Sequence, residues 1–372
     1  MATLRQKVGL LRGLLDGQVA HTGPLFVDVD VTERCNLQCI GCMYHSPLLD
    51  HSGQGQRDIP LKMLEKLSSE LRGMGTRSII LQGAGEPLLH PDIAEIIATF
   101  KDAGFAVKLL TNGTLLNRKN AQKLIKAGLN VLQVSLWATT PEHYRAQYPG
   151  TSLDTFELVI ENLRLFSIIK AESVRTTPLL LVHYPINANN YQSIDRLIDL
   201  AQSAKCSGVS FAPWYAAGAS VDQFSLSTAQ ERDVVQSLGR AKRRAESLNI
   251  HHNLNQVLSR YRIGKAIWES CPCYIAWFHA RIRVNGDVDP CGRCKLSLGS
   301  LQEWSFPQLW NESEIRAFRR SAMTLEGVTG LRAQCDCTYC CFAVENLQVH
   351  RFFRWFAPLA PLVPRRRSCI GH

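Results

Sequence analysis

The sequence lacks several features that mark whole classes of protein. No run of apolar residues reaches the ~18–20 that a helix needs to cross a bilayer. The first eight residues contain no continuous apolar core of the kind found in secretion signals, and the chain has neither an internal repeat nor a low-complexity tract. We therefore expect a chain that is soluble, or at most peripheral to a membrane, and that works in the cytoplasm.

The composition does not indicate disorder. The chain has 372 residues, of which 45% are hydrophobic, so it can bury a large core and has room for one big domain and a smaller one. Lys and Arg number 42 against 32 Asp and Glu, which gives a formal net charge of +10. This charge favours anionic partners in general, such as an acidic substrate, nucleic acid, a lipid surface or an acidic protein, and does not choose among them.

Cysteine, by contrast, is abundant and unevenly placed. The 13 cysteines fall in groups, and in a reducing compartment such groups indicate metal binding. Cys35, Cys39 and Cys42 follow a strand-like run, so one short loop gathers three thiols. Zinc and most iron–sulfur clusters take four protein ligands, so a centre with three keeps one position open for a reactive molecule. The alternatives are three unrelated core cysteines, or a structural zinc knuckle completed by His45 or His51.

Strand-like and helix-like stretches alternate along the first half of the chain. Apolar residues at helical spacing fill the segments between the strands, as in Ile93, Ile96, Ile97 and Phe100. This alternation predicts an α/β fold with right-handed crossovers and a parallel sheet, in which chemistry takes place at the carboxyl ends of the strands. The six expected strands are residues 25–31, 78–82, 106–111, 131–136, 179–184 and 208–212.

The spacing Cys-x3-Cys-x2-Cys of the first cysteine group resembles that of the radical S-adenosylmethionine (radical SAM) superfamily. The resemblance implies that Cys35, Cys39 and Cys42 hold a [4Fe-4S] cluster whose fourth iron binds the amino and carboxylate groups of SAM. It also implies a partial (β/α)6 TIM-like barrel, which we expect over residues 25–215 after a helical segment at residues 1–24. A reductant such as flavodoxin or ferredoxin would supply the electron that cleaves SAM to a 5′-deoxyadenosyl radical.

Several further residues match positions that bind SAM in this superfamily. Gly83, Gly85 and Glu86 resemble its Gly-Gly-Glu motif, which binds the SAM amino group. Without the cysteine loop, the same residues would be an ordinary strand-to-helix turn. The other expected contacts, to the ribose or carboxylate of SAM, are Thr111, Asn112, Ser135, Arg145 and Asn187. The alternative for the strand-end residues among them is a common Asn-Gly turn and a helix cap.

One position departs from the superfamily pattern. The residue before the third cysteine is usually aromatic and stacks near the adenine of SAM, but in this chain it is Gly41. Tyr44 or Met43 is the expected substitute. Trp137, just beyond the fourth expected strand, either packs on a substrate ring or belongs to the core.

A second group of cysteines spans residues 271–341. Cys273, Gly286 and Cys291 fit Cys-x12-Gly-x4-Cys around a hairpin turn, and a Cys-x2-Cys pair follows. The arrangement resembles the SPASM or shorter twitch extension of radical SAM enzymes, which implies a small cysteine-rich auxiliary-cluster domain at residues 266–345. One auxiliary [4Fe-4S] cluster is the simplest expectation, two are possible with the eight cysteines present, and a zinc ribbon is the alternative. The expected ligands are Cys273, Cys291, Cys337 and Cys340.

Two other segments have no expected site of their own. Residues 216–265 are helical and charged, which predicts a bridge between the domains. Residues 346–372 form a basic, aromatic tail with prolines. We expect its aromatic residues to pack against the cysteine-rich domain, because Pro358 and Pro361 prevent a long amphipathic helix. Peripheral contact with an anionic membrane is the alternative.

Together these features predict a radical SAM oxidoreductase or maturase. After SAM cleavage, hydrogen-atom abstraction would lead to oxidation, epimerisation or cross-linking of a substrate, and the sequence assigns no catalytic residue beyond the cofactor contacts. A peptide is one expected substrate class, although the short stretch before the first strand shows no separate leader-binding domain; a carbohydrate, aminocyclitol or lipid-linked glycan is the other. No nucleic-acid partner is expected. The contrasting possibility is a non-catalytic iron–sulfur or zinc protein that binds nucleic acid.

Overall fold

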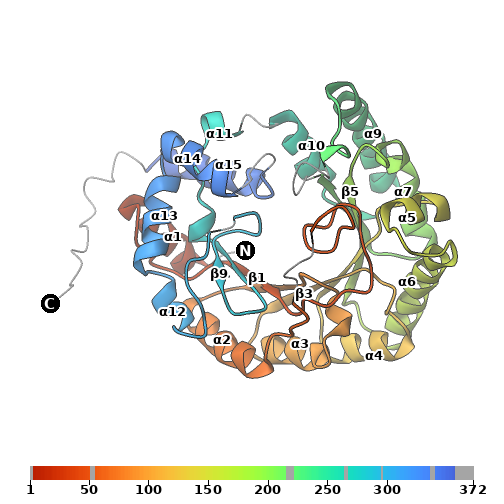
Figure 1. Ribbon diagram of the computed structural model, residues 1–372, viewed down its shortest axis with the longest axis horizontal. Helices are drawn as coiled ribbons and strands as arrows, with labels where there is room; N and C mark the ends of the chain where they lie inside the picture. Colours follow the sequence, from red (N-terminus) through yellow and green to blue (C-terminus); the bar gives the residue numbers. More distant parts are fainter. Residues whose placement is uncertain are drawn as a thin grey trace.

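The computed structural model describes residues 3–50, 55–214, 222–263, 267–294, 296–335 and 340–356. Within these ranges the chain forms an α/β fold in which one nine-stranded sheet is lined on its outer side by helices (Figure 1). The predicted Cys337 and the end of the tail, residues 357–372, lie outside the described residues. No helix in the described ranges is long and apolar enough to cross a membrane.

The six strands expected from the sequence are confirmed, and consecutive strands pair in parallel. Each is followed by a helical segment, so the crossovers place helices on one face of the sheet. Neither end strand of the sheet pairs with the other in the described ranges, which makes the barrel partial. The six strands are β1 (Phe26–Asp30), β2 (Ser78–Gln82), β3 (Ala106–Thr111), β4 (Val131–Ser135), β5 (Leu179–Ile186) and β6 (Gly208–Pro213).

The sheet extends beyond these six strands at both ends. The segment predicted as a helical bridge also contains the short strand β7 (His251–His252), which pairs in parallel with β6. At the other end, β8 (His279–Ile282) pairs in parallel with β1, and β9 (Val288–Asp289) returns antiparallel to β8. The sheet therefore runs across the expected boundary between the barrel and the cysteine-rich region.

Helices surround the outer side of this sheet and cover its ends (Figure 1). Those of the barrel are α1 (Leu4–Asp16), α2 (Leu61–Met74), α3 (Ile93–Asp102), α4 (Arg118–Lys126), α5 (Pro141–Gln147), α6 (Asp154–Glu172) and α7 (Ile194–Ser203). Those that follow are α9 (Thr228–Ser247), α10 (Leu254–Ile263), α11 (Ile267–Ser270), α12 (Phe306–Leu309), α13 (Ser313–Ala322), α14 (Leu325–Cys335) and α15 (Ala343–Arg354).

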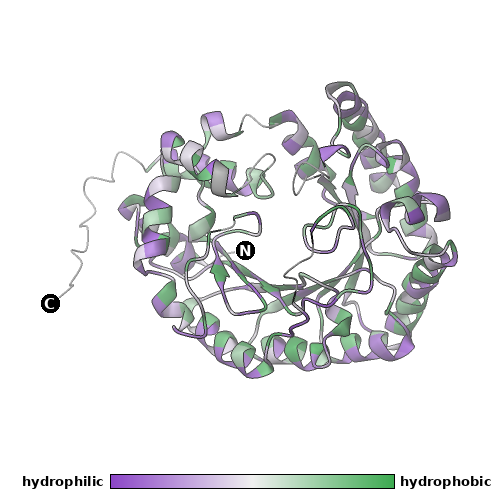
Figure 2. Ribbon diagram, in the orientation of Figure 1, coloured by the Kyte–Doolittle hydropathy of each residue, from purple (hydrophilic) through white to green (hydrophobic). Residues whose placement is uncertain are grey.

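The core lies between the sheet and the helices because the strands alternate in polarity. In β1, Val27 and Val29 are fully buried, whereas Asp28 and Asp30 project from the opposite, concave face. In Figure 2 the strands are mostly green, and the outer helices carry purple residues beside green ones. The concave face therefore collects polar side chains, and the loops after the strands gather at one edge of it.

Candidate active site

A cavity of about 260 Å³ opens where the loops after β1, β2, β3 and β4 meet. It brings together most of the residues that the sequence predicts as cofactor contacts. Those that line it are Cys35, Cys39, Cys42, Tyr44, Gly83, Gly85, Glu86, Thr111, Asn112 and Ser135.

The three cysteines form a donor set that suits an iron–sulfur cluster. Burial raises the pKa of Cys35 to about 11, and burial followed by the charges of Cys42 and Cys35 raises the pKa of Cys39 well above its usual value. Burial also raises the pKa of Cys42. Three thiolates this close are costly without compensating positive charge, which bound iron supplies.

Backbone groups around the third cysteine also suit a thiolate. The amide N–H groups of Tyr44 and His45 donate hydrogen bonds to Cys42 Sγ, at 3.4 Å and 3.3 Å. The Cys42 amide in turn donates to the Cys39 carbonyl at 3.0 Å. In the described part of the chain, no three His, Cys, Asp or Glu side chains converge on the position of a single metal ion. A four-iron cluster differs from a single ion, because each thiolate binds its own iron.

Glu86 lines the cavity and is almost completely buried. Its Oε1 accepts hydrogen bonds from Thr111 Oγ1 at 2.6 Å and the Leu88 amide at 3.0 Å, and its Oε2 accepts one from the Asn112 amide at 2.7 Å. Burial raises the pKa of Glu86, against the lowering effect of these donors. A carboxylate can accept about four hydrogen bonds. Oε2 therefore keeps one acceptor position for a cationic group of a ligand.

The glycines of the same loop are also needed for close backbone packing. Gly83 and Gly85 match the motif that contacts SAM, and both line the cavity, so that role stays a prediction. A Cβ on Gly85 would collide with the Arg34 carbonyl, and one on Gly83 with the Gly85 carbonyl. The Gly85 amide donates to the Thr32 carbonyl at 2.8 Å. The absence of a side chain at Gly85 thus lets this loop lie against the cysteine loop, and the absence of one at Gly83 lets the loop fold closely on itself.

The departure at Gly41 has a structural explanation. Trp214, at the end of β6 and 6% exposed, packs its ring directly on Gly41, and a Cβ there would overlap the ring. Trp214 meets Trp137 edge to face, with ring centroids 5.7 Å apart, and Trp137 contacts Tyr148 at 5.7 Å. Gly41, Trp137 and Tyr148 all line the cavity. The cavity therefore has aromatic lining from Trp137, after β4, and Tyr148, at the end of α5, and Tyr44 of the cysteine loop lines it as well, so its role beside adenine stays a prediction.

Two predicted SAM contacts are not brought into the cavity. Arg145 is exposed on α5. Asn187 is fully buried after β5, and its side-chain amide pairs with that of Gln147 through bonds of 3.0 Å and 3.4 Å. Neither residue is among those that line the cavity. A role for either in binding SAM stays a prediction.

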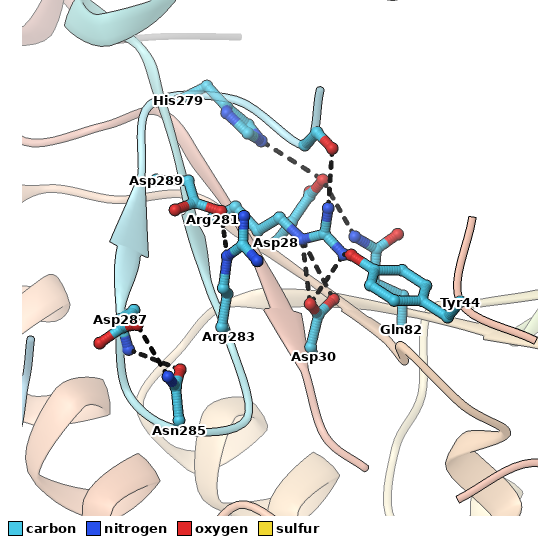
Figure 3. A network of polar contacts seen from close by, with 11 residues as sticks. Asp28, Asp30, Tyr44, Gln82, His279, Arg281, Arg283, Asn285, Asp287 and Asp289 are labelled. Atoms are coloured by element: carbon cyan, nitrogen blue, oxygen red, sulfur yellow. Dashed lines mark hydrogen bonds and ion pairs between the residues drawn. The ribbon is translucent and has the colours of Figure 1, made fainter. Parts of the chain in front are cut away.

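Sequence reasoning missed a buried ion pair beside the site. Arg281 on β8 donates from Nε and Nη2 to Asp30 on β1, at 3.0 Å and 2.7 Å (Figure 3). Arg281 Nη2 also donates to the Tyr44 hydroxyl at 2.7 Å. The available signal was alternation, because in both strands charged residues stand at every second position among apolar ones.

The predicted auxiliary-cluster ligands in the described residues come from separate segments, and one residue bridges the segments of Cys273 and Cys340. The Asn346 side chain accepts from the Tyr274 amide, next to Cys273, at 2.8 Å and donates to Cys340 Sγ at 3.5 Å. Cys291 follows the β8–β9 hairpin, whose turn residue Gly286 has a positive φ of 87°.

Two further cysteines of this region are in direct contact. Cys294 and Cys335, which were outside the predicted ligand set, are joined by a disulfide. This contact links the loop that carries Cys291 to the end of α14.

The described part of the tail packs only in part. Phe353 contacts Tyr274, with ring centroids 6.1 Å apart, whereas Phe352 is 43% exposed and Trp355 is 85% exposed. The expectation that all these aromatic residues pack on the cysteine-rich region is therefore met by Phe353 and not by Phe352 or Trp355. Contact with a membrane stays a prediction.

Comparisons with known families agree with this geometry. The sequence profile of the Radical SAM superfamily matches residues 29–201, and the profile of the iron–sulfur cluster-binding domain SPASM matches residues 271–341. Among curated proteins, a probable GTP 3′,8-cyclase of Methanococcus maripaludis is 36% identical over 152 residues. That match covers 41% of this chain and 46% of the relative, so the chain spans less than half of that relative's length.

Solved structures show the same fold. Streptococcus suis SuiB bound to S-adenosylmethionine superposes with a TM-score of 0.64 at 16% identity, over 82% of this chain and 69% of that one. The protein anSMEcpe with bound AdoMet superposes with a TM-score of 0.62 at 18% identity, over 92% of this chain and 96% of that one. The chain therefore belongs to the radical SAM superfamily, carries a SPASM iron–sulfur domain, and has [4Fe-4S] clusters and SAM as its cofactors.

Proposed function

We propose that this protein is a radical SAM enzyme that cleaves SAM reductively and abstracts a hydrogen atom from a peptide substrate, with one auxiliary cluster assisting. The observation that carries the proposal is the single cavity that gathers all three cysteines, Glu86 and the ends of β3 and β4. A three-cysteine [4Fe-4S] cluster with SAM supplies the 5′-deoxyadenosyl radical. Oxidation, epimerisation and cross-linking are the reaction outcomes open to such a radical.

The chain's own residues would hold SAM by its two ends. Glu86 Oε2 has the acceptor position that suits the SAM amino group, because a carboxylate forms its strongest hydrogen bonds with a cation. Trp137 and Tyr148, supported by Trp214, offer the aromatic surface that suits adenine. Glu86, Tyr148 and Trp214 are buried and Trp137 is half-buried, which would limit the access of water to the reacting atoms. Cys273, Cys291, Cys337 and Cys340 are the proposed auxiliary ligands.

A second cavity supports a peptide as the substrate. It has a volume of about 190 Å³ and shares Tyr44, His45 and Ala84 with the cofactor cavity, so a molecule in it would lie beside bound SAM. Its charges come as pairs: Arg57 contacts Glu33 at 2.7 Å, and Arg283, also in its lining, contacts Asp289 at 2.5 Å. Such a lining offers donors and acceptors without net charge, which suits peptide groups.

Two of the structural relatives were solved with peptides. SuiB was crystallised with its precursor peptide SuiA, and anSMEcpe with the Cp18Cys peptide. At 16% and 17% identity these similarities support the choice of substrate class without naming a substrate.

The test uses the full chain, reconstituted with iron and sulfide without oxygen and supplied with SAM and dithionite. We expect 5′-deoxyadenosine to form, to be lost in Cys39→Ala, and to increase when a suitable peptide is added. A cluster-loaded chain that forms none contradicts the proposed activity. An increase with carbohydrates and with no tested peptide contradicts the peptide assignment.

A further inference from the structure

Arg281 contacts three segments that lie far apart in the sequence. Its guanidinium pairs with Asp30 on β1, donates from Nη2 to the Tyr44 hydroxyl at 2.7 Å, and donates from Nη1 to the Gly292 carbonyl at 2.8 Å (Figure 3). The Arg281 side chain is 5% exposed and that of Asp30 is 2% exposed. One buried cation therefore joins the barrel strand, the first cysteine loop and the auxiliary cysteine loop.

The Tyr44 contact leads directly to the first cluster site. Tyr44 lies two residues after Cys42, and its backbone amide is one of the two donors to Cys42 Sγ. Its side chain lines the cofactor cavity. The Arg281 guanidinium also lies over the Tyr44 ring, 5.7 Å from its centroid. A shift of Arg281 would therefore move a residue that contacts both the cluster ligand and the cofactor space.

The Gly292 contact leads to the second cluster site. Gly292 follows Cys291, and the Cys294 amide donates to the Cys291 carbonyl at 3.1 Å, which makes a tight turn of this loop. A Cβ on Gly292 would come within 3.3 Å of Arg281 Nη1, so this backbone and the guanidinium are in close contact. A change in the loop around Cys291 would therefore change the position of the guanidinium.

The pairing of β8 with β1 limits how far Arg281 can move in response to such a change. β8 pairs in parallel with β1, with Arg281 opposite Asp28, and the bidentate contact with Asp30 fixes the orientation of the guanidinium plane. Because Nη1 contacts Gly292 and Nη2 contacts both Asp30 and Tyr44 on one rigid guanidinium plane, a displacement at Gly292 would alter the contact with Tyr44.

We propose that Arg281 is a positioning residue that couples the two cysteine loops, so that the state of the auxiliary loop sets the affinity for SAM at the first. The proposal rests on the proposed function, because it concerns the SAM site of that enzyme. Coupling of this kind is a free energy shared by two sites, and a double-mutant cycle measures it.

The test combines Cys291→Ser, which removes an auxiliary ligand, with Tyr44→Phe, which removes only the hydroxyl that Arg281 holds. The readouts in the reconstituted full chain are SAM affinity by anaerobic equilibrium dialysis and amide hydrogen exchange of residues 43–50. We expect Cys291→Ser to weaken SAM binding by about fivefold or more and to speed exchange in this loop. In the Tyr44→Phe background the same change should have little further effect.

Additive effects of the two substitutions on either readout would overturn the proposal. Tyr184→Phe is the matched control, because it removes a buried hydroxyl that donates to the Asn190 carbonyl, away from this network. If Cys291→Ser does not fold, Arg281→Lys replaces it, because the single nitrogen of lysine cannot reproduce the contacts that Arg281 makes from three separate nitrogens. A chain that fails to cleave SAM but still shows non-additive exchange would contradict the proposed function and support the coupling.

Discussion

The ring of Trp214 rests on the bare α-carbon of Gly41, and this contact joins the end of β6 to the middle of the cysteine loop. The superfamily's usual aromatic residue at this position would occupy the space that Trp214 fills. The two residues are 173 positions apart in the sequence. The missing side chain at Gly41 and the large ring of Trp214 therefore fit each other in size.

Gly41→Ala tests this match. The added methyl group should displace the Trp214 ring and the loop between Cys39 and Cys42, at a cost of ~1–3 kcal/mol typical of overpacking. We expect lower iron content and weaker SAM binding, measured by iron analysis and equilibrium dialysis. Gly73→Ala is the control, because nothing lies within 4 Å of a Cβ at that glycine.

Adding Trp214→Leu to Gly41→Ala tests whether overlap with the Trp214 ring causes the loss of iron and SAM binding. It opens the space above residue 41, so the double variant Gly41→Ala/Trp214→Leu should bind more iron than Gly41→Ala alone. If the double variant binds as little iron as Gly41→Ala does, steric overlap with Trp214 is not the reason for the loss.

Glu86→Gln should weaken SAM binding by about 10–100-fold, because a hydrogen bond to a charged group contributes ~1.5–3 kcal/mol. Burial raises the pKa of Glu86. The carboxylate form is therefore lost as the pH falls through that raised pKa, and SAM affinity of the unmodified chain should fall with it. Equilibrium dialysis across a pH series measures both effects. A Glu86→Gln chain with the same affinity and pH profile would remove Glu86 from the SAM site, and Glu65→Gln on α2 is the control.

Asp30→Asn should destabilise the fold by ~3–5 kcal/mol, because it leaves the Arg281 guanidinium buried without its carboxylate. Urea denaturation gives the free energy of unfolding. Asp195→Asn breaks the exposed Arg240–Asp195 pair, whose N–O distance is 3.1 Å, and should cost less than ~1 kcal/mol. Equal costs for the two changes would contradict the assignment of Asp30 and Arg281 as a structural pair.

His183 should make stability depend on pH. Burial, and then the charge of Lys108, lowers the pKa of His183 to about 3 from a usual value of 6.5. The unfolded chain takes up a proton below pH 6.5 that the folded chain does not, so stability is lost as the pH falls from 6.5 toward about 3. The loss from this residue is at most ~1.4 kcal/mol per pH unit.

Urea denaturation of the unmodified chain and of His183→Asn across this pH window measures the contribution. The free energy of unfolding of His183→Asn should depend less steeply on pH than that of the unmodified chain. Parallel curves of unfolding free energy against pH would mean that His183 is protonated in the folded state. His251→Asn, at an exposed position on β7, is the control.

Local sequence signals were enough to predict the barrel strands and the loops that form the cavity. Cys39 and Glu86 lie in the loops that follow β1 and β2, and the edge of a parallel sheet brings such loops together. The sequence could not show that β8 joins β1, because that pairing unites segments about 250 residues apart.

For the same reason the partner of Gly41 and that of Asp30 were not predicted. The alternation in both strands indicates which face each charged residue takes, but not which charge lies opposite. The motif that contains Gly83 and Gly85 could be recognised in the sequence, but the close contact of Gly85 with the Arg34 carbonyl of the cysteine loop could not.

The most direct test of the central claim is electron paramagnetic resonance of the reduced three-cysteine cluster, recorded with and without SAM labelled with nitrogen-15 at its amino group. The chain used is Cys273→Ala/Cys291→Ala, so that the auxiliary signal is absent, and SAM is supplied at saturating concentration because loss of Cys291 is expected to weaken its binding. We expect SAM to change the g values and the label to produce a hyperfine coupling, because one iron has no protein ligand. A spectrum that SAM leaves unchanged would show that all four irons are already ligated by the protein, or that SAM binds elsewhere, and would contradict the account.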